Sequence, residues 1–382
     1  MKVIVAAHQG DLGGATTPIV EAAEALAPRG FRFVVLVPEA GTIVPALDRL
    51  GVEWRVCPLP LWVSTRGRRR LRNILANRRA YPAVTAALAQ AAPDIVVTNT
   101  SAVGIVGRAA RALGLPHAWW LHEFGREDHN LHYDLGDAIA GRLMARRCVR
   151  AFANSDAVAA KFARWLGPDR VGRVDYFIRP VPDAVVPAPE PAGAFHLALV
   201  GSLNRQKGQN DAIAAVARLA AAGRDVHLHL YGTGGRRYAG KLAALAAARG
   251  VAARVHFHGH VADVAARVAK ADAALVTSRC EAFGRVTVEA MRAGVPVVGT
   301  RAGGTPELVE DGRTGLLYPP GDATALAACI GRLIDAPGFA RELARAGRDW
   351  AGPRFGKAQF ADALAREFAA TRDGFGGTRR AW

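Results

Sequence analysis

Two glutamates, Glu281 and Glu289, are eight positions apart and follow an apolar run at 273–277 that predicts a strand. An ionised carboxylate only accepts hydrogen bonds, so each glutamate suits a pair of hydroxyls, as on a ribose or a hexose. Phe283, Gly284 and Arg285 begin a predicted helix, where backbone N–H groups and the positive end of the helix dipole attract phosphate. These residue types in this order predict a site for a ligand that carries both hydroxyls and phosphate.

A second polar segment, 201–208, follows the first predicted strand of the second half of the chain. Arg205 and Lys207 flank a polar turn there, and fixed cations can stabilise the negative charge that develops on a departing phosphate. The full sequence contains no Asp-x-Asp, a pattern that often binds a metal beside phosphates. We therefore expect these two side chains to do this work, with no metal and no cofactor.

The N-terminal half offers a glycine-rich loop and a histidine. Gly13 and Gly14 lie between the first predicted strand and a helix that Thr17-Pro18 should begin. The third glycine of the dinucleotide-binding pattern is missing and no acidic residue ends the second strand, which argues against a dehydrogenase. His122 ends the predicted strand 117–121, where it can donate to a sugar hydroxyl or to the backbone.

Short apolar strands alternate with alanine-rich helices along all 382 residues, a pattern typical of an α/β protein with parallel sheets. Five prolines between 180 and 191 interrupt it, so we expect an N-terminal domain at 1–180, a linker at 181–194, a C-terminal domain at 195–355 and a terminal helix and tail at 356–382. Both domains read as Rossmann-like, and open α/β sheets bind ligands at the carboxyl ends of their strands. We expect the active site in a cleft between the two domains.

The segment 281–289 and those at 293–299, 303–307, 311–317 and 320–322 resemble the C-terminal half of the retaining GT-B glycosyltransferases of family 4. The likeness continues through 201–208, 232–234 and 258–259, and covers essentially the whole second domain. It implies the GT-B fold and transfer of a sugar from a UDP- or GDP-linked donor to an acceptor hydroxyl with retention. One departure is Ser202, since family members commonly carry Arg there, and Arg205 would substitute for it.

The resemblance also implies individual roles. Glu289 would hold the ribose hydroxyls, Glu281 and the Phe283 and Gly284 amides would hold the donor sugar, and His122 would contact that sugar. We expect the donor site to comprise Gly13, Gly14, Gly201, Ser202, Phe283, Gly284, Arg285, Val286 and Glu289, and the catalytic residues to be Glu281, Lys207, Arg205 and His122.

The formal net charge is +17, and seven arginines fall between 66 and 79. A solvated face is one explanation, and contact with an anionic membrane through Arg66, Arg68, Arg69, Arg70 and Arg72 is another. Nucleic acid is not expected, because this stretch lacks interleaved aromatic residues. Without a spanning or secretory segment in the sequence, we expect a cytoplasmic enzyme, peripheral at the inner face of the membrane, acting on a glycan or lipid-linked sugar of the cell envelope.

Two other classes of function stay open. A GT-B epimerase or hydrolase would turn over the nucleotide sugar without an acceptor. A basic protein without catalytic activity would bind nucleic acid or lipid through its arginines.

Overall fold

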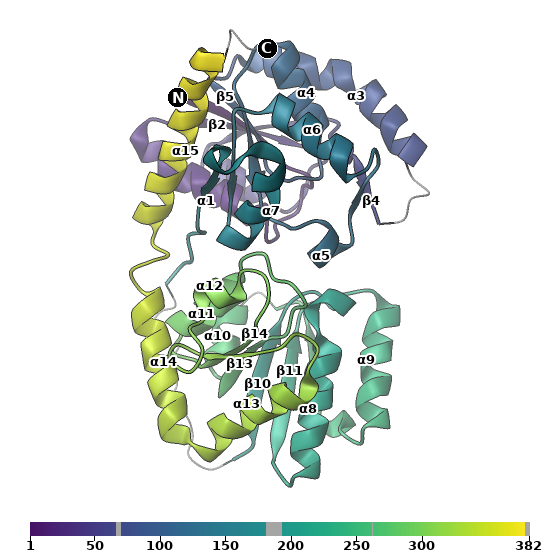
Figure 1. The fold of residues 1–382 in the computed structure, drawn as a ribbon, viewed down its shortest axis with the longest axis vertical. Coiled ribbons are helices and arrows are strands. Elements are labelled where there is room, and N and C mark those ends of the chain that lie inside the picture. The colour runs from purple at the N-terminus through teal and green to yellow at the C-terminus, as the bar shows by residue number, and fades with distance from the viewer. Residues whose placement is uncertain (66–69, 181–192, 262, 379–382) are drawn as a thin grey trace. The chain divides into compact units, whose positions relative to one another are not determined.

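The computed structural model describes residues 1–65, 70–180, 193–261 and 263–378 (Figure 1). The chain divides into two compact units, unit 1 (Met1–Phe177 and Lys357–Trp382) and unit 2 (Ile178–Gly356). The expected linker at 181–194 lies largely outside the described residues. The C-terminal helix, which the sequence left unassigned to either domain, belongs to unit 1.

Unit 1 is built on a seven-stranded sheet in the order β3-β2-β1-β5-β6-β8-β9, with every neighbouring pair parallel. Its strands are β1 (Lys2–Ala6), β2 (Arg32–Val37), β3 (Glu53–Val56), β5 (Ile95–Thr98), β6 (His117–Leu121), β8 (Arg150–Ala153) and β9 (Val171–Arg173). Strands β4 (Val63–Ser64) and β7 (His132–Tyr133) form a separate antiparallel pair. The central strands β5 and β6 are buried along their whole length because helices cover both faces of a parallel sheet.

One face of this sheet packs on α3 (Arg70–Ala91) and α4 (Ile105–Ala112). The other face packs on α1 (Thr17–Leu26), α2 (Val44–Arg49) and α15 (Lys357–Thr378). The remaining helices of unit 1 are α5 (Arg126–His129), α6 (Asp137–Arg147) and α7 (Asp156–Leu166). As the sequence predicts, α1 begins with Thr17-Pro18. Ser155 caps α7 by accepting a hydrogen bond from the Val158 N–H.

Helix α15 returns to unit 1 and lies beside α1 (Figure 1). Phe360, Leu364 and Phe368 are buried in the core of unit 1. Lys357 forms an ion pair with Glu24 at 2.9 Å. The apolar stripe at helical spacing explains why this distant segment completes the first sheet's packing.

Unit 2 contains a six-stranded parallel sheet in the order β12-β11-β10-β13-β14-β15. Its strands are β10 (Phe195–Val200), β11 (Val226–Tyr231), β12 (Val255–Gly259), β13 (Ala273–Val276), β14 (Val297–Thr300) and β15 (Leu316–Tyr318). Its helices are α8 (Gln209–Ala221), α9 (Arg236–Ala248), α10 (Val264–Val268), α11 (Arg285–Arg292), α12 (Thr305–Leu308), α13 (Ala323–Asp335) and α14 (Pro337–Ala351).

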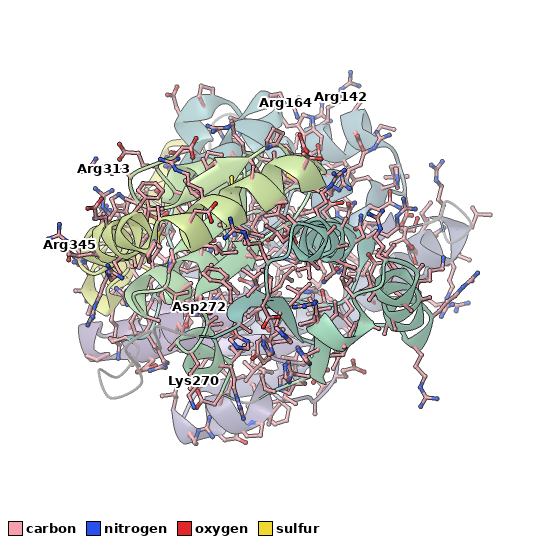
Figure 2. All side chains as sticks on the ribbon, turned by 90° about the horizontal axis from the view of Figure 1, so that it is seen from below. Arg142, Arg164, Lys270, Asp272, Arg313 and Arg345 are labelled. Atoms are coloured by element: carbon pink, nitrogen blue, oxygen red, sulfur yellow. The ribbon has the colours of Figure 1, made fainter. Side chains whose placement is uncertain are left out.

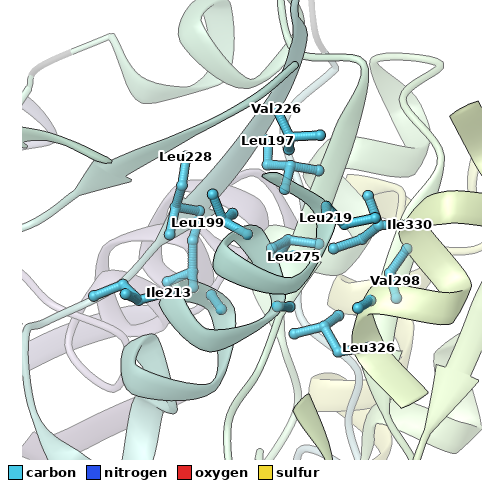
Figure 3. Packing of buried hydrophobic residues seen from close by; sticks show 14 of the residues in the cluster. Leu197, Leu199, Ile213, Leu219, Val226, Leu228, Leu275, Val298, Leu326 and Ile330 are labelled. Atoms are coloured by element: carbon cyan, nitrogen blue, oxygen red, sulfur yellow. The ribbon is translucent and has the colours of Figure 1, made fainter. Parts of the chain in front are cut away.

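The core of unit 2 lies between one face of the sheet and helices α8, α9 and α13. Figure 3 shows Leu199, Leu228 and Leu275 of the sheet packed near Ile213 of α8 and Leu326 of α13. The predicted α/β class with two parallel sheets is thereby confirmed.

Two helices of unit 1 are long. Helix α3 extends from Arg70 to Ala91, and its Arg, Leu and Ala residues favour helix. Helix α15 runs to Thr378, and residues 379–382 lie outside the described residues.

No single helix of the described chain is long and apolar enough to cross a membrane. Helices α13 and α14, bent by 104° relative to each other, pass that test of length and composition when taken together.

Candidate functional site

The centre of the candidate site in unit 2 is an ion pair between Lys207 and Glu281. Lys207 Nζ lies 2.8 Å from Glu281 Oε2, and the two side chains are 29% and 17% exposed. Ser278 Oγ donates to the same carboxylate oxygen at 2.6 Å. Two segments that lie far apart in the sequence therefore meet at one carboxylate.

Lys207 is positioned by the turn that follows β10. Asn204 caps a short 3₁₀ turn (η5, Arg205–Lys207) by accepting from the backbone N–H groups of Gln206 and Lys207. Thr277 Oγ1, at the end of β13, donates to the Lys207 carbonyl at 2.6 Å. Gly208 has φ +66°, and a Cβ there would lie 2.0 Å from the Thr277 carbonyl oxygen. Glycine is thus required for the turn to pack against β13.

Glu281 is held from its other side by the loop after β14. The Glu281 carbonyl accepts a hydrogen bond from the Gly304 N–H at 2.7 Å. Gly303 has φ +61°, and a Cβ there would lie 2.2 Å from the same carbonyl oxygen. Thr300 Oγ1 donates to the Ser278 carbonyl at 2.7 Å. Gly303 and Gly304 therefore hold the backbone of Glu281 in place, and this backbone positions the Glu281 side chain.

Helix α11 carries the other predicted donor-binding residues. It follows Gly284, which is left-handed at φ +95°. Arg285 Nε and Glu289 Oε1 lie 4.0 Å apart on successive turns of the helix, and both side chains are partly buried. Phe283 is buried, with its ring edge-on to Phe355 at 5.8 Å. The Phe283 side chain thus serves packing and the predicted role falls to its backbone N–H, while Val286 is half-buried on the helix.

The start of the 201–208 loop is tightly packed against β11. Gly201 donates its N–H to the Tyr231 carbonyl at 2.9 Å, and its φ is +154°. Gln209 Nε2 donates to the Ser202 carbonyl at 3.0 Å. Arg205 is exposed on the same turn as Lys207, so its predicted contact with phosphate stays a prediction.

In unit 1, the loop after β1 has a defined conformation. The Gly13 carbonyl accepts from the Thr16 and Thr17 N–H groups and so begins α1. Thr16 Oγ1 donates to the Asp11 carbonyl at 2.6 Å. A Cβ added to Gly14 would meet no atom within 4 Å, so the backbone there has room for a ligand to approach.

His122 is buried at the carboxyl end of β6. Its Nδ1 lies 2.5 Å from the Tyr176 hydroxyl and its Nε2 2.7 Å from Asn99 Oδ1. Both ring nitrogens are therefore engaged within unit 1, and contact with a sugar would require one of these bonds to be exchanged. The predicted substrate contact stays a prediction.

The neighbour of His122, Glu123, is a buried carboxylate at the same strand end. Its Oε1 accepts from Thr100 Oγ1, Ser101 Oγ and the Ser101 N–H, each at 2.7 Å. Burial by itself raises the pKa of Glu123, but His122 and the bonds from Ser101 and Thr100 outweigh it, so the pKa is lowered. Burial lowers the pKa of His8, which also interacts electrostatically with Glu123. Glu123 is thus held ionised in a buried position.

Sequence reasoning assigned no role to Ser278, to the Glu123 network or to the partners of His122. Asn99, Thr100 and Ser101 form a polar run directly after the apolar strand β5, and this was the signal that could have been used. Ser278 likewise comes just after β13. Both groups are polar residues that directly follow a parallel strand, at the edge of the sheet where ligands bind.

Comparison with protein families decides the membership of this chain. Residues 194–336 match the model described as glycosyl transferases group 1, and residues 13–176 match the glycosyl transferase 4-like domain. Together these two matches extend over most of the chain. The chain belongs to the glycosyl transferases group 1 family. The resemblance of the sequence to glycosyltransferases of this group is confirmed.

Individual relatives are more distant. The glycogen synthase of Mycobacterium tuberculosis is 35% identical over 184 residues, which is 48% of this chain and 44% of that protein. The lipopolysaccharide core biosynthesis glycosyltransferase LpsE of Rhizobium meliloti is 33% identical over 173 residues, 45% of this chain and 49% of LpsE. The matches thus span about half the length of these curated relatives.

The fold has close counterparts among solved structures. The crystal structure of Anabaena Alr3699/HepE in complex with UDP has a TM-score of 0.80 and 24% sequence identity, and the match covers 97% of this chain and 100% of that one. The present chain therefore has the GT-B fold.

Proposed function

We propose that this protein transfers a sugar from a nucleotide-diphosphate sugar to an acceptor hydroxyl, with retention at the anomeric carbon and without a metal ion. The observation that carries the proposal is the Lys207–Glu281 pair, which joins the 201–208 loop to the start of α11. It lies within the part of the chain that matches the glycosyl transferases group 1 model.

The arrangement suggests how each group would act. Glu281 accepts hydrogen bonds from hydroxyls of the donor sugar, and Glu289 from the ribose. As the glycosidic bond breaks, negative charge grows on the departing diphosphate, and the Lys207 ammonium stabilises it from a fixed position. The acceptor oxygen forms the new bond to the anomeric carbon, and its proton passes to the departing phosphate oxygen. Positioning and charge stabilisation are then the whole of the catalysis.

The comparisons support the class of donor and acceptor without defining either. Other crystals of Anabaena Alr3699/HepE contain UDP-glucose, so a UDP-linked donor is the first to try, with GDP-linked sugars next. The likeness to LpsE, a glycosyltransferase of lipopolysaccharide core biosynthesis, favours an acceptor glycan or glycolipid of the cell envelope.

The test is acceptor-dependent turnover with a panel of UDP- and GDP-sugars. We expect release of nucleoside diphosphate to rise strongly when an acceptor is added, activity to survive exhaustive treatment with EDTA, and NMR of the product to show the donor's anomeric configuration. Turnover that needs no acceptor would instead assign a hydrolase or an epimerase. Loss of activity in EDTA with recovery in magnesium would refute the metal-free mechanism.

We also propose that unit 1 contacts an anionic membrane through the start of α3. Leu71, Ile74 and Leu75 are 78%, 36% and 51% exposed and lie on one side of this helix by their spacing. Arg70 and Arg72 are exposed beside them, whereas the predicted Arg66, Arg68 and Arg69 lie outside the described residues. Exposed apolar side chains flanked by arginines are typical of a helix that lies in a membrane surface.

A further inference from the structure

Five histidines lie on one face of the sheet of unit 2, at its β12 edge. They are His196 on β10, His227 and His229 on β11, and His256 and His258 on β12, and we refer to them as the histidine cluster. Each alternates with apolar residues such as Leu197 and Leu228, which point to the core on the opposite face. The parallel register pairs His196 with His227, and His229 with His256.

The imidazoles bond to one another in two chains. His229 stands in the middle of the first chain, with its Nε2 2.9 Å from His196 Nδ1 and its Nδ1 2.9 Å from His258 Nε2. In the second chain, His227 Nδ1 lies 2.9 Å from His256 Nε2. The two chains lie against each other, because the rings of His229 and His256 are stacked with centroids 4.8 Å apart.

These bonds limit how many protons the cluster can hold. A neutral imidazole has one N–H donor and one acceptor nitrogen, so each chain is satisfied when every ring is neutral. One added proton can be shared along a chain. A second proton on an adjacent ring removes the acceptor from an N–H···N bond and places two charges about 5 Å apart, where they repel.

The charged groups around the cluster do little to offset that repulsion. Asp225 Oδ1 lies 3.4 Å from His227 Nε2, but it is also paired with Arg254. Asp272, labelled in Figure 2 with Lys270 on the segment between α10 and β13, accepts the backbone N–H of His196 at 2.7 Å.

Helix α10, which packs on β10, supplies a cation. Its Arg267 lowers the pKa of His258, in addition to the larger effect of burial. Tyr231, also on β11, stacks on the His258 ring at 4.6 Å and carries no charge at neutral pH. Arg267 therefore opposes the charging of His258, and the Asp225 carboxylate next to His227 is shared with Arg254.

Proton binding rather than metal binding fits this geometry. Among the described residues, no group of three or more His, Cys, Asp or Glu side chains could hold a metal ion. The ring nitrogens point at each other instead of converging on one point.

We propose that the histidine cluster makes unit 2 acid-sensitive: as the pH falls below about 6.5, protons bind the imidazoles of the opened chain more readily than those of the folded cluster, where added charge breaks the mutual hydrogen bonds, and β11 therefore separates more easily from β10 and β12. This element is distinct from the residues that we assign to donor binding and catalysis.

The position of the cluster connects it to the 201–208 loop. The Gly259 carbonyl, next to His258, accepts from the Gly232 N–H at 2.7 Å. A Cβ on Gly232 would lie 2.2 Å from the Gly201 carbonyl oxygen, so these backbones are in close contact. Gly201 begins the loop that carries Lys207. Loosening β11 and β12 would therefore also disturb the loop that we assign to the nucleotide diphosphate.

The direction of the pH dependence follows from the pKa values. Burial, followed by the neighbouring imidazoles, lowers the pKa of His229 to about 4, and burial is the largest cause of the lowered pKa values of His256 and His258. In the unfolded chain a histidine titrates near 6.5. Between these values the unfolded chain binds more protons, so the stability of unit 2 decreases as the pH falls from about 6.5 to 4.

The test measures the melting temperature of the full-length protein from pH 7.5 to 4.5. The double variant His229→Gln/His256→Gln keeps a donor and an acceptor at one ring position in each chain but cannot become charged. We expect the melting temperature of the wild type to fall by about 5 °C more than that of the double variant across this range. His260→Gln, which changes an exposed histidine outside the cluster, is the matched control and should follow the wild type.

Two further measurements keep the proposal falsifiable if the double variant does not fold. The single variant His229→Gln should show part of the same effect, and the ring protons of wild-type His229 should titrate below pH 5 by NMR. Equal pH dependence in wild type and variants, or titration of His229 near 6.5, would overturn the proposal. So would a rise in melting temperature with zinc at pH 7.5 that the variants lack, because it would reassign the cluster to metal binding.

The consequence for the nucleotide rests on the proposed function and is measured separately. We expect the affinity for UDP to fall about twofold more in the wild type than in the double variant between pH 7.5 and 4, because His229 is about half protonated at pH 4. If UDP binds at neither pH while the melting temperatures behave as expected, the proposed UDP-linked donor is refuted and the acid-sensitive element stands.

Discussion

Replacement of Lys207 by methionine tests the centre of the candidate site, because methionine keeps much of the side-chain length and removes the charge. The aliphatic part of Lys207 passes 3.5 Å from the position that a Cβ on Gly201 would occupy, so an apolar side chain can fill that space. The variant loses the 2.8 Å contact with Glu281 Oε2, while Ser278 still donates to that oxygen.

The size of the effect follows from burial. Both side chains are less than one third exposed, so water replaces the lost ammonium poorly. A hydrogen bond between charged groups contributes about 1.5–3 kcal/mol, and we expect Lys207→Met to reduce the free energy of unfolding of unit 2 by about that amount. The loss of transition-state charge stabilisation should lower kcat by about 100-fold, with a smaller effect on nucleotide affinity.

A double-mutant cycle with Glu281→Gln measures the pair itself. Urea unfolding of the wild type, both single variants and the double variant should give a coupling energy of about 1–2 kcal/mol. The matched control is the ion pair of Arg313 and Glu310, whose charged atoms lie 2.7 Å apart and whose side chains are 70% and 56% exposed. This exposed pair should have a coupling energy of less than about 0.5 kcal/mol. Equal coupling in the two pairs, or a kcat reduced less than threefold, would show that Lys207 is an ordinary solvated lysine.

Three other changes test separate parts of the reasoning. Glu289→Ala should weaken UDP and UDP-sugar binding alike, by about 1–3 kcal/mol in calorimetry, and unchanged UDP affinity would remove its assignment to the ribose. Gly303→Ala should lower the melting temperature more than Gly312→Ala, because both have positive φ but only Gly303 meets the Glu281 carbonyl; equal losses would contradict that close contact. Leu71→Ser should reduce co-sedimentation with anionic lipid vesicles at low salt, with donor binding unchanged. Equal sedimentation of the variant and the wild type would show that the start of α3 is an ordinary solvated helix face.

Local sequence patterns were sufficient to predict the elements around the site. The apolar run before Ser278 predicts β13, Phe283, Gly284 and Arg285 predict the start of α11, and Thr17-Pro18 predicts the start of α1. These features depend on side chains within a few positions of each other, so the sequence contains the physical cause directly. Family resemblance added the GT-B fold and the individual roles of the two glutamates, which stay predictions.

Contacts between distant segments needed the tertiary structure. Lys207 and Glu281 are 74 positions apart, and only the parallel neighbours β10 and β13 bring their loops together. The ring nitrogens of His122 are engaged by Asn99 and Tyr176 from other strand ends, which no local pattern indicates.

The histidine cluster shows the same division between local pattern and tertiary contact. The sequence alternates histidine with apolar residues on β11 and β12, which predicts that each strand has one polar face. Whether the two polar faces meet depends on strand order and register, which the packing of the whole sheet determines. If the register between β11 and β12 shifted by one residue, His256 and His258 would lie on the opposite face of the sheet. The two hydrogen-bonded chains of histidines therefore depend on the register that the packing of the folded sheet determines.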